Sequence, residues 1–214
     1  MFPFPFSFLG SAAPSPELEL IDNDFAMEFN GSDEYISAGN PTELQFTSSF
    51  SISAWFKSSS ATSQRIVSKD DGTNRSYFVQ LSATGAIEAA IYTSGTKQLN
   101  TSASGLADGN WHHLVFTFEN GVGTKLYIDN GTPTTDSATG TLDNDTNNFE
   151  IGRREDGSKF FNGDIDEVAV WNKVLDATDV ATIYNATNNN PGKCANLWSG
   201  GLSTGLVYWN RMGD

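Results

Sequence analysis

Hydrophobic and polar residues alternate most clearly at residues 111–118, where the sequence reads Trp-His-His-Leu-Val-Phe-Thr-Phe. Successive side chains of a strand point to opposite faces, so every second residue from His112 to Phe118 falls on one side. A second run, residues 125–128, follows one Asn-Gly pair and leads into another. The pattern predicts two antiparallel strands of a sheet with a strongly apolar face.

Residues 50–56 alternate in the same way and predict a further strand. The polar stretch at residues 58–64 is of the kind that connects two sheets. The inward-facing side chains of the predicted strand are Phe50, Ile52, Ala54 and Phe56.

Asn-Gly and Asp-Gly pairs bound most of the β-favouring runs along the chain. Each pair signals a tight turn, and their close spacing predicts an antiparallel meander with Greek-key crossings. A first strand pair is expected at residues 18–29 and 34–38, joined by the turn at residues 30–33. Other strands are expected at residues 65–68, 77–82, 87–92, 149–152, 163–171 and 206–209.

One helix is expected near the C-terminal end of this strand-rich region. Asp176 can cap its first turn, and Asp179 lies three residues further on. Val180, Ile183 and Tyr184 then form an apolar stripe at helical spacing.

Composition narrows the classes of partner. The 214 residues include 12 Lys and Arg against 26 Asp and Glu, so the formal net charge is −14. A field of that sign repels phosphate backbones and anionic lipid, which argues against nucleic acid and bare membrane as partners. Cys194 is the single cysteine of the chain, so no internal disulfide can form. No stretch of 18 apolar residues is present that could span a membrane.

Residues 1–16 differ from the rest of the chain, because they begin Met-Phe-Pro-Phe-Pro-Phe-Ser-Phe-Leu. Two prolines disfavour a helix and no Lys or Arg precedes the apolar run, so an extended arm is favoured over a secretory signal. Exposed phenylalanines are costly in water, so we expect the arm to dock on its own domain, a neighbouring subunit or a larger assembly, most readily in a homo-oligomer. The residues of this assembly arm are Phe2, Phe4, Phe6 and Phe8.

Three segments together resemble one family. They are the hairpin at residues 109–131, the Phe-Ser-Ile-Ser-Ala-Trp strand at residues 50–55, and the closing strand at residues 163–175 with the helix after it. This combination resembles laminin-G-like and pentraxin-like domains of the concanavalin A-like lectin/glucanase class, over about residues 25–185. The resemblance implies an all-β fold, a two-sheet antiparallel jelly-roll sandwich with one short C-terminal helix.

The resemblance also suggests how the chain is divided. Residues 17–186 would form the jelly roll, and residues 187–214 a linker and a C-terminal strand that completes or extends the sandwich. The final residues 209–214, Trp-Asn-Arg-Met-Gly-Asp, look like the opening of a further unit, as in multi-unit virion proteins of marine phages. Pentraxins usually carry an internal disulfide, and this chain departs from them there.

Candidate catalytic residues are few. Laminarinase-type enzymes on this jelly roll need carboxylates alternating along one strand, and the nearest approach here is Asp164, Asp166 and Glu167, in the wrong register. His112 and His113 are adjacent and would point to opposite faces of a strand, so they cannot chelate one metal ion together. These observations predict a protein that is not an enzyme.

Calcium is the cofactor that the resemblance suggests. In the jelly-roll family a structural calcium often sits where an aspartate of the closing strand meets an early loop. The matching residues are Asp166 and Asp33, the latter in the loop of residues 30–33. The alternative is that Asp166 caps backbone amides without an ion.

A second candidate calcium site is implied at the ligand face of pentraxins. The matching loops are residues 69–74 and 152–157, and Arg154 stands where a pentraxin would place a coordinating carboxylate. The alternative is a pair of solvated loops in which Arg154 pairs with Asp156 or Glu155. The candidate oxygen ligands are Asp71, Asn74, Glu155 and Asp156.

Taken together, the sequence predicts a non-catalytic jelly-roll adhesion module. The resemblance places it on a phage-like virion surface, as a capsid decoration or fibre protein that contacts glycans and neighbouring subunits. The alternatives are a secreted, calcium-dependent lectin of pentraxin type and a degenerate glycosidase. Sugar binding without metal needs an aromatic platform, for which the candidates by residue type are Trp55, Tyr77, Tyr92 and Tyr127.

Overall fold

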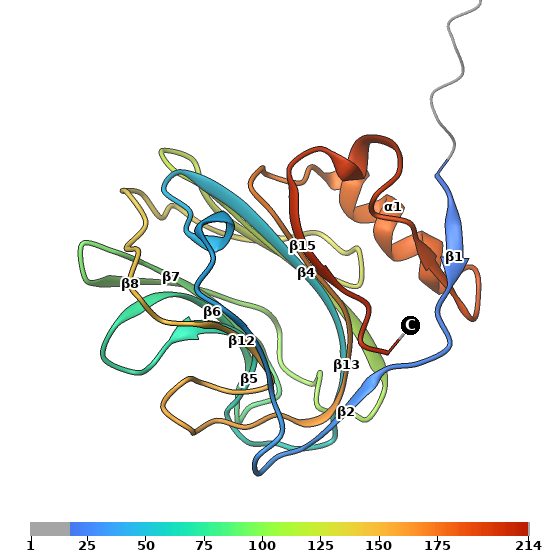
Figure 1. The fold of residues 1–214 in the computed structure, drawn as a ribbon, viewed down its shortest axis with the longest axis horizontal. Helices are drawn as coiled ribbons and strands as arrows, with labels where there is room; N and C mark the ends of the chain where they lie inside the picture. The colour runs from blue at the N-terminus through green and yellow to red at the C-terminus, as the bar shows by residue number, and fades with distance from the viewer. Residues whose placement is uncertain (1–17, 214) are drawn as a thin grey trace, which may run out of the picture.

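Two antiparallel sheets face each other across a hydrophobic core in the computed structural model, which describes residues 18–213 (Figure 1). The seven-stranded sheet has the order β11-β10-β9-β4-β13-β15, with β2 also paired to β13. Its strands are β2 (Met27–Asn30), β4 (Ser49–Lys57), β9 (Trp111–Glu119), β10 (Gly123–Ile128), β11 (Thr134–Asp136), β13 (Asn162–Trp171) and β15 (Leu206–Asn210).

The six-stranded sheet has the order β3-β12-β5-β6-β7-β8. Its strands are β3 (Ile36–Gly39), β5 (Gln64–Asp70), β6 (Arg75–Leu81), β7 (Ile87–Thr93), β8 (Thr96–Thr101) and β12 (Phe149–Ile151). Every pairing in both sheets is antiparallel. The predicted all-β antiparallel sandwich is therefore confirmed, and the polar loop at residues 58–64 does connect the two sheets.

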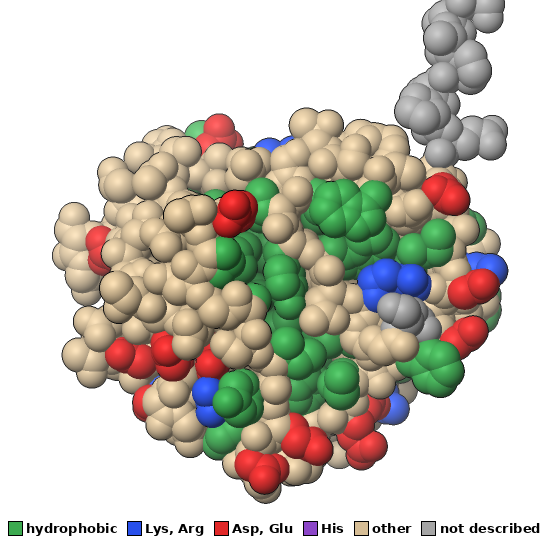
Figure 2. Space-filling view, in the orientation of Figure 1, with side chains coloured by type: hydrophobic (Ala, Val, Ile, Leu, Met, Phe, Trp, Pro, Cys, Tyr) green, Lys and Arg blue, Asp and Glu red, His purple; other side chains and the backbone are tan. Residues whose placement is uncertain are grey.

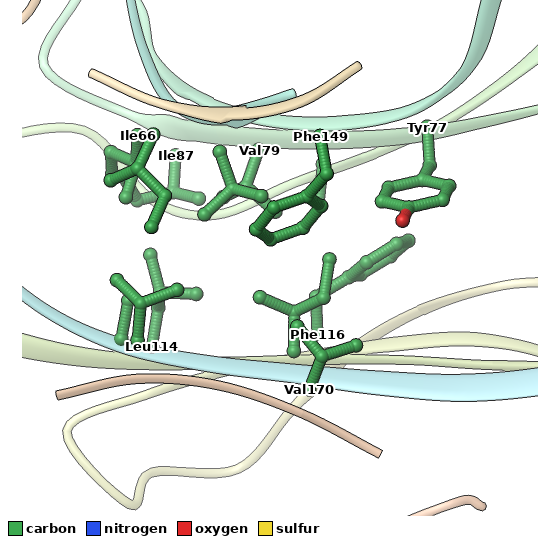
Figure 3. Close-up of a cluster of buried hydrophobic side chains, with 14 of the residues drawn as sticks. Ile66, Tyr77, Val79, Ile87, Leu114, Phe116, Phe149 and Val170 are labelled. Carbon is green, nitrogen blue, oxygen red and sulfur yellow. The ribbon is translucent and has the colours of Figure 1, made fainter. Parts of the chain in front are cut away.

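The core lies between the sheets and is built from the alternate residues of each strand. Figure 3 shows Tyr77 and Phe149 of the six-stranded sheet facing Phe116 and Val170 of the other. Each side chain of this size contributes about 1.5–3 kcal/mol when it is fully buried. The four residues predicted to point inward from β4 all have 0% exposure: Phe50, Ile52, Ala54 and Phe56.

The helix α1 (Ala177–Asn188) packs on the outer face of the seven-stranded sheet. Asp176 caps it by accepting hydrogen bonds from the backbone of Thr178 and Asp179, and Asp179 completes a capping box. Val180 and Ile183 then pack with the fully buried Trp171 of β13 in a second hydrophobic cluster. The predicted helix and its cap are confirmed. Within residues 18–213 no helix is long and apolar enough to cross a membrane.

The predicted first strand pair is wrong. β2 pairs with β13, whereas β3 pairs with β12, so the two strands belong to opposite sheets. The intervening turn crosses the edge of the sandwich, and Phe29 is buried beneath it, edge-on to Phe161 at 6.3 Å between ring centroids. The N-terminal part of the predicted strand forms a separate strand, β1 (Leu20–Asp22).

The C-terminal segment forms part of the sandwich. β15 pairs with β13 in the seven-stranded sheet, and β14 (Lys193–Ala195) pairs with β1 in a small ribbon. Two short 3-10 helices, η1 (Thr42–Leu44) and η2 (Gly200–Ser203), complete the elements. Figure 2 shows acidic side chains along the lower rim of the face in view and few basic ones, as the net charge of −14 requires.

Gly152 lies close to the ring of Phe29, so a substitution at Gly152 tests the packing around Phe29. Gly152 has φ +85°, and a Cβ there would lie 2.5 Å from Phe29 Cε1. We expect Gly152→Ala to lower the free energy of unfolding by ~3 kcal/mol, the sum of left-handed strain and overpacking. The matched control is Gly157→Ala. Gly157 has φ +74°, and no atom lies within 4 Å of where its Cβ would be, so this substitution should lower the free energy of unfolding by only ~1 kcal/mol. Equal losses in urea denaturation would contradict the predicted clash.

Candidate functional site

A groove opens on the outer face of the seven-stranded sheet, beside α1. Its volume is about 510 Å³, within the range of roughly 300–1,000 Å³ that is usual for small-ligand sites. We call it the α1 groove. Its lining residues are Asn23, Asp24, Phe25, Ala26, Trp55, Trp111, His112, Asp129, Asp166, Tyr184, Thr187, Asn188 and Pro191.

Aromatic rings form one wall of the α1 groove. Trp55 of β4 points outward because Ala54 and Phe56 on either side of it face the core. Its ring stacks on that of Tyr184 from α1, with centroids 5.7 Å apart and an interplanar angle of 10°. Trp111, at the start of β9, is 40% exposed. The groove therefore offers flat apolar surface next to solvent.

Carboxylates form the polar part of the α1 groove. Asp166 accepts hydrogen bonds from Asn23 Nδ2 at 2.9 Å and from the backbone amide of Glu167 at 2.8 Å. Asp129 accepts from the backbone amide of His113, and its other oxygen lies 2.8 Å from His112 Nδ1. These contacts hold both carboxylates in fixed positions.

Two buried polar atoms near the α1 groove have no hydrogen-bond partner within residues 18–213: Trp55 Nε1, a donor, and Asn23 Oδ1, an acceptor. Buried polar atoms in folded proteins are nearly always paired. These two atoms are exceptions to that rule, and both belong to side chains that line the groove.

His113 lies behind the groove wall and is 1% exposed. Its ring packs against Trp55 at 4.9 Å, and its Nε2 lies 2.9 Å from Ser53 Oγ. Burial lowers the pKa of His113 to about 3, so the ring is neutral at physiological pH. His112 instead packs against Phe56 at 5.7 Å. The two histidines lie on opposite faces of β9, as predicted.

The structure does not bring Asp166 and Asp33 together. The turn at residues 30–33 lies against Asn162, because a Cβ on Gly31 would be 2.9 Å from Asn162 Cβ. Asn162 is four residues before Asp166 along β13, which is about 13 Å at the rise of a strand. The early segment that reaches Asp166 is instead the one containing Asn23.

The two loops of the second candidate calcium site do lie together. The Glu155 amide donates to the Asp70 carbonyl at 3.2 Å, and the Arg154 guanidinium lies against Gly72. Arg154 bonds Asp156 at 2.6 Å, as predicted, and this contact is the main reason that the pKa of Asp156 falls to about 2.

Of the other predicted ligands of that site, Asp71 and Asn74 bond to each other within their own loop, whereas Glu155 accepts from the backbone amide and side chain of Asn148. The Asp71 carboxylate accepts from the backbone amides of Thr73 and Asn74 and from the Asn74 side chain. Across residues 18–213, no three His, Cys, Asp or Glu side chains are grouped so that they could hold a metal ion.

The three acidic residues of β13 point to different places. Asp164 pairs with Lys57 at 2.8 Å, whereas Asp166 lines the α1 groove. Glu167 has φ +50° within a bulge of β13, and its Oε2 accepts from Trp209 Nε1 at 2.7 Å. Burial raises the pKa of Glu167. The strand therefore does not present the alternating carboxylates of a laminarinase-type site.

Of the four aromatic residues proposed as sugar platforms, Trp55 alone lines the α1 groove. Tyr77, Tyr92 and Tyr127 are 0%, 5% and 5% exposed and lie in hydrophobic clusters. The sequence reasoning missed Trp111, Tyr184, Asp129 and the segment at residues 23–26. The alternation of each strand places Trp55 and Trp111 on the face away from the core, and this pattern could have indicated the aromatic wall. The predicted arm, Phe2, Phe4, Phe6 and Phe8, lies outside the described residues.

A family comparison agrees with this fold. Residues 30–181 match a laminin-G family model described as the concanavalin A-like lectin/glucanases superfamily. The chain belongs to this superfamily. The resemblance seen in the hairpin, the β4 strand and the closing strand is thereby confirmed at the level of the family.

Two adhesion receptors match part of the chain in sequence. The human adhesion G-protein coupled receptor D1 is 32% identical over 81 residues, which are 36% of this chain and 9% of the receptor. The zebrafish (Danio rerio) receptor V1 is 24% identical over 152 residues, or 66% of this chain and 2% of the receptor. The chain thus spans a small part of the curated relatives that it matches.

Solved structures share the fold at low identity. A candidate carbohydrate-binding protein from Bacteroides ovatus superposes with a TM-score of 0.63 and 18% identity, over 89% of this chain and 53% of that one. The binding domain of Paraclostridial Mosquitocidal Protein 1 superposes with a TM-score of 0.64 and 16% identity, over 82% of this chain and 47% of that one. A third structure is domain 4 of AbnA, an extracellular arabinanase from Geobacillus stearothermophilus, in complex with arabinotriose. It superposes with a TM-score of 0.54 and 20% identity, over 76% of this chain and 79% of that one.

Burial of His113 makes stability depend on pH. Its pKa falls from the ordinary 6.5 to about 3 on folding, so between these values the unfolded chain binds a proton that the folded chain excludes. The contribution of His113 to the free energy of unfolding is therefore fully present above pH 6.5. Between pH 6.5 and about 3 it decreases by about 1.4 kcal/mol per pH unit as the pH falls. We expect His113→Gln to flatten the dependence of unfolding free energy on pH in this window. A slope unchanged by His113→Gln would contradict this account.

Proposed function

We propose that this chain is a non-catalytic glycan-binding module and that the α1 groove is its binding site. The observation that carries the proposal is the aromatic lining of the groove, the 40% exposed Trp111 together with Trp55 and Tyr184, beside carboxylates held by hydrogen bonds. Aromatic faces pack against the apolar faces of sugar rings, while carboxylates and amides accept hydrogen bonds from sugar hydroxyls. The lectin-type family and the titles of several structural neighbours support the same class of ligand.

A binding role fits the acidic residues better than hydrolysis does. Glycoside hydrolases place two carboxyl groups across the scissile bond. In β13, Asp164 is engaged by Lys57, and Glu167 by Trp209 and Arg211. Asp166 is left as the only β13 carboxylate among the residues described as lining the groove. We therefore expect no hydrolysis of β-glucans.

A calcium-dependent, pentraxin-like lectin is the alternative. The contact between residues 69–74 and 152–157 favours it, because these loops would carry the ion. The guanidinium of Arg154 opposes it, since that positive charge lies against Gly72 and pairs with Asp156 between the same loops. The glycan site that we propose lies in the α1 groove and needs no calcium.

The first test is a Trp111→Ala substitution. Trp111 is 40% exposed in the groove, so we expect the variant to melt as the wild type does but to bind glycans about tenfold more weakly, a loss of ~1.4 kcal/mol for one aromatic contact. The control is Trp198→Ala, which removes an indole that is 62% exposed and does not line the groove. This variant should bind glycans as tightly as the wild type does. The ligand comes from a glycan array, and calorimetry in calcium and in chelator gives the affinities. If no glycan binds, or if chelator abolishes binding, the proposed site is wrong.

The setting that we propose is the surface of a phage-like virion, where residues 1–16 would anchor the module to neighbouring subunits. The support is the acidic composition and the four phenylalanines near the N-terminus. We expect antibodies against the folded region to label intact particles, and a chain lacking residues 1–16 to fold but to be absent from them. Particles that incorporate the shortened chain normally would refute the anchoring role.

A further inference from the structure

One side of the sandwich is bordered by the last strand of each sheet. β15 ends the seven-stranded sheet and β3 ends the six-stranded sheet, so in the described part of the chain no strand pairs with the outer edge of either. Both strands lie toward the viewer in Figure 1, and the ring of Tyr208 on β15 is 5.2 Å from that of Phe149 on β12, the strand beside β3. Such edges present backbone N–H and C=O groups with which a further strand can pair.

Apolar side chains between these two edge strands are partly exposed. Val207 and Tyr208 of β15 and Ile36 and Ala38 of β3 pack against the main core cluster without being fully buried. We call these four residues the edge strip. Figure 2 shows apolar side chains gathered in a band down the middle of this face, over and beside β15. Partly exposed apolar side chains next to an unpaired strand edge are the two features that strand addition uses.

The sequence of residues 2–8 has the chemistry of an added edge strand. Phenylalanine occupies every even-numbered position, and Pro3 and Pro5 lie between the phenylalanines. In an extended chain all four rings therefore fall on one face, and the backbone groups of even-numbered residues all point to the same edge. Proline has no N–H and is tolerated in a strand where its position faces solvent. With Pro3 and Pro5 facing solvent, the phenylalanines make the hydrogen bonds of the ladder.

Charge and position make the arm of a second copy the occupant. Residues 1–16 contain no Asp, Glu, Lys or Arg, so this segment approaches a chain of net charge −14 without the repulsion between two whole domains. The described chain also begins beside the edge, because Leu18 and Trp209 of β15 pack against the same hydrophobic cluster. An arm that starts beside the edge it occupies on a partner is the arrangement that a two-fold axis makes reciprocal. Residues 9–17 reach at most about 30 Å when extended, which lets residues 2–8 cross to the other copy.

We infer that residues 2–8 of a second copy add to the outer edge of β15 as a strand, with their phenylalanine rings on the edge strip. This inference rests on the anchoring role proposed above for residues 1–16, and it adds the surface that receives them. Exchange of arms in both directions joins two copies through a two-fold axis.

The oligomeric state of the full chain tests the occupant and the surface. We expect light scattering to show dimers, and Phe6→Asp to leave monomers because it places a charge on the edge strip. Ser7→Asp places the same charge on the solvent side of the added strand and should keep the dimer. Val207→Asp should also give monomers, whereas Val122→Asp, at a valine that is 61% exposed between β9 and β10, should not. A monomeric wild type, or a dimer that survives Phe6→Asp, would overturn the inference.

Synthetic peptides of residues 1–16 test the hydrogen bonds of the added strand without changing the folded region. An excess of the unmodified peptide should dissociate the full-chain dimer. N-methylation of Phe6 removes a ladder N–H but keeps the ring, so we expect it to weaken competition at least about tenfold. N-methylation of Ser7 removes a solvent-facing N–H and should leave competition unchanged. Equal effects of the two modifications would overturn strand addition.

Failure of arm exchange and failure of the anchoring role are distinguishable. If the full chain is monomeric but its shortened form is absent from particles, the arm anchors to another component and the inference is wrong while the anchoring role stands. If the shortened chain enters particles normally, the anchoring role is wrong whatever the oligomeric state of the full chain.

Discussion

Antiparallel pairing of β4 with β9 on one side and β13 on the other is the interaction on which both the core and the groove depend. In this register Trp55 lies opposite His113 on β9 and opposite Asp166 on β13. The inward residues of β4 fill the space between the sheets, while its outward residues build the wall of the groove. A slip of one residue would exchange the two faces, burying Trp55 in the core and exposing Phe56.

Helix α1 converts an outward sheet face into a recess. Its buried side chains pack on Trp171, whose indole also donates to the Leu202 carbonyl at 2.7 Å. This packing places Tyr184 against Trp55, so the two rings are stacked before any ligand arrives. A preformed wall loses little conformational entropy on binding, which favours recognition of weakly apolar ligands such as sugars.

The acidic residues of β13 and of the loops at residues 69–74 and 152–157 are held by partners within the fold. Glu167 lies in a bulge of β13, where it accepts a hydrogen bond from Trp209 and pairs with Arg211. At the opposite loops, Arg154 supplies the cation that pairs with Asp156.

Local patterns along the chain were sufficient to predict antiparallel strands, the faces of β4 and β9, and the capped helix, because period-2 and period-3.6 alternation and capping act over a few residues. The two-sheet sandwich was predicted from the family resemblance of three segments. They could not predict that β2 and β3 lie in opposite sheets, since a turn of the same sequence can close a hairpin or cross an edge. The site needed tertiary structure for the same reason. Trp55, Trp111, Tyr184 and Asp129 come from four different segments of the chain, and only sheet pairing and the docking of α1 bring them to one groove.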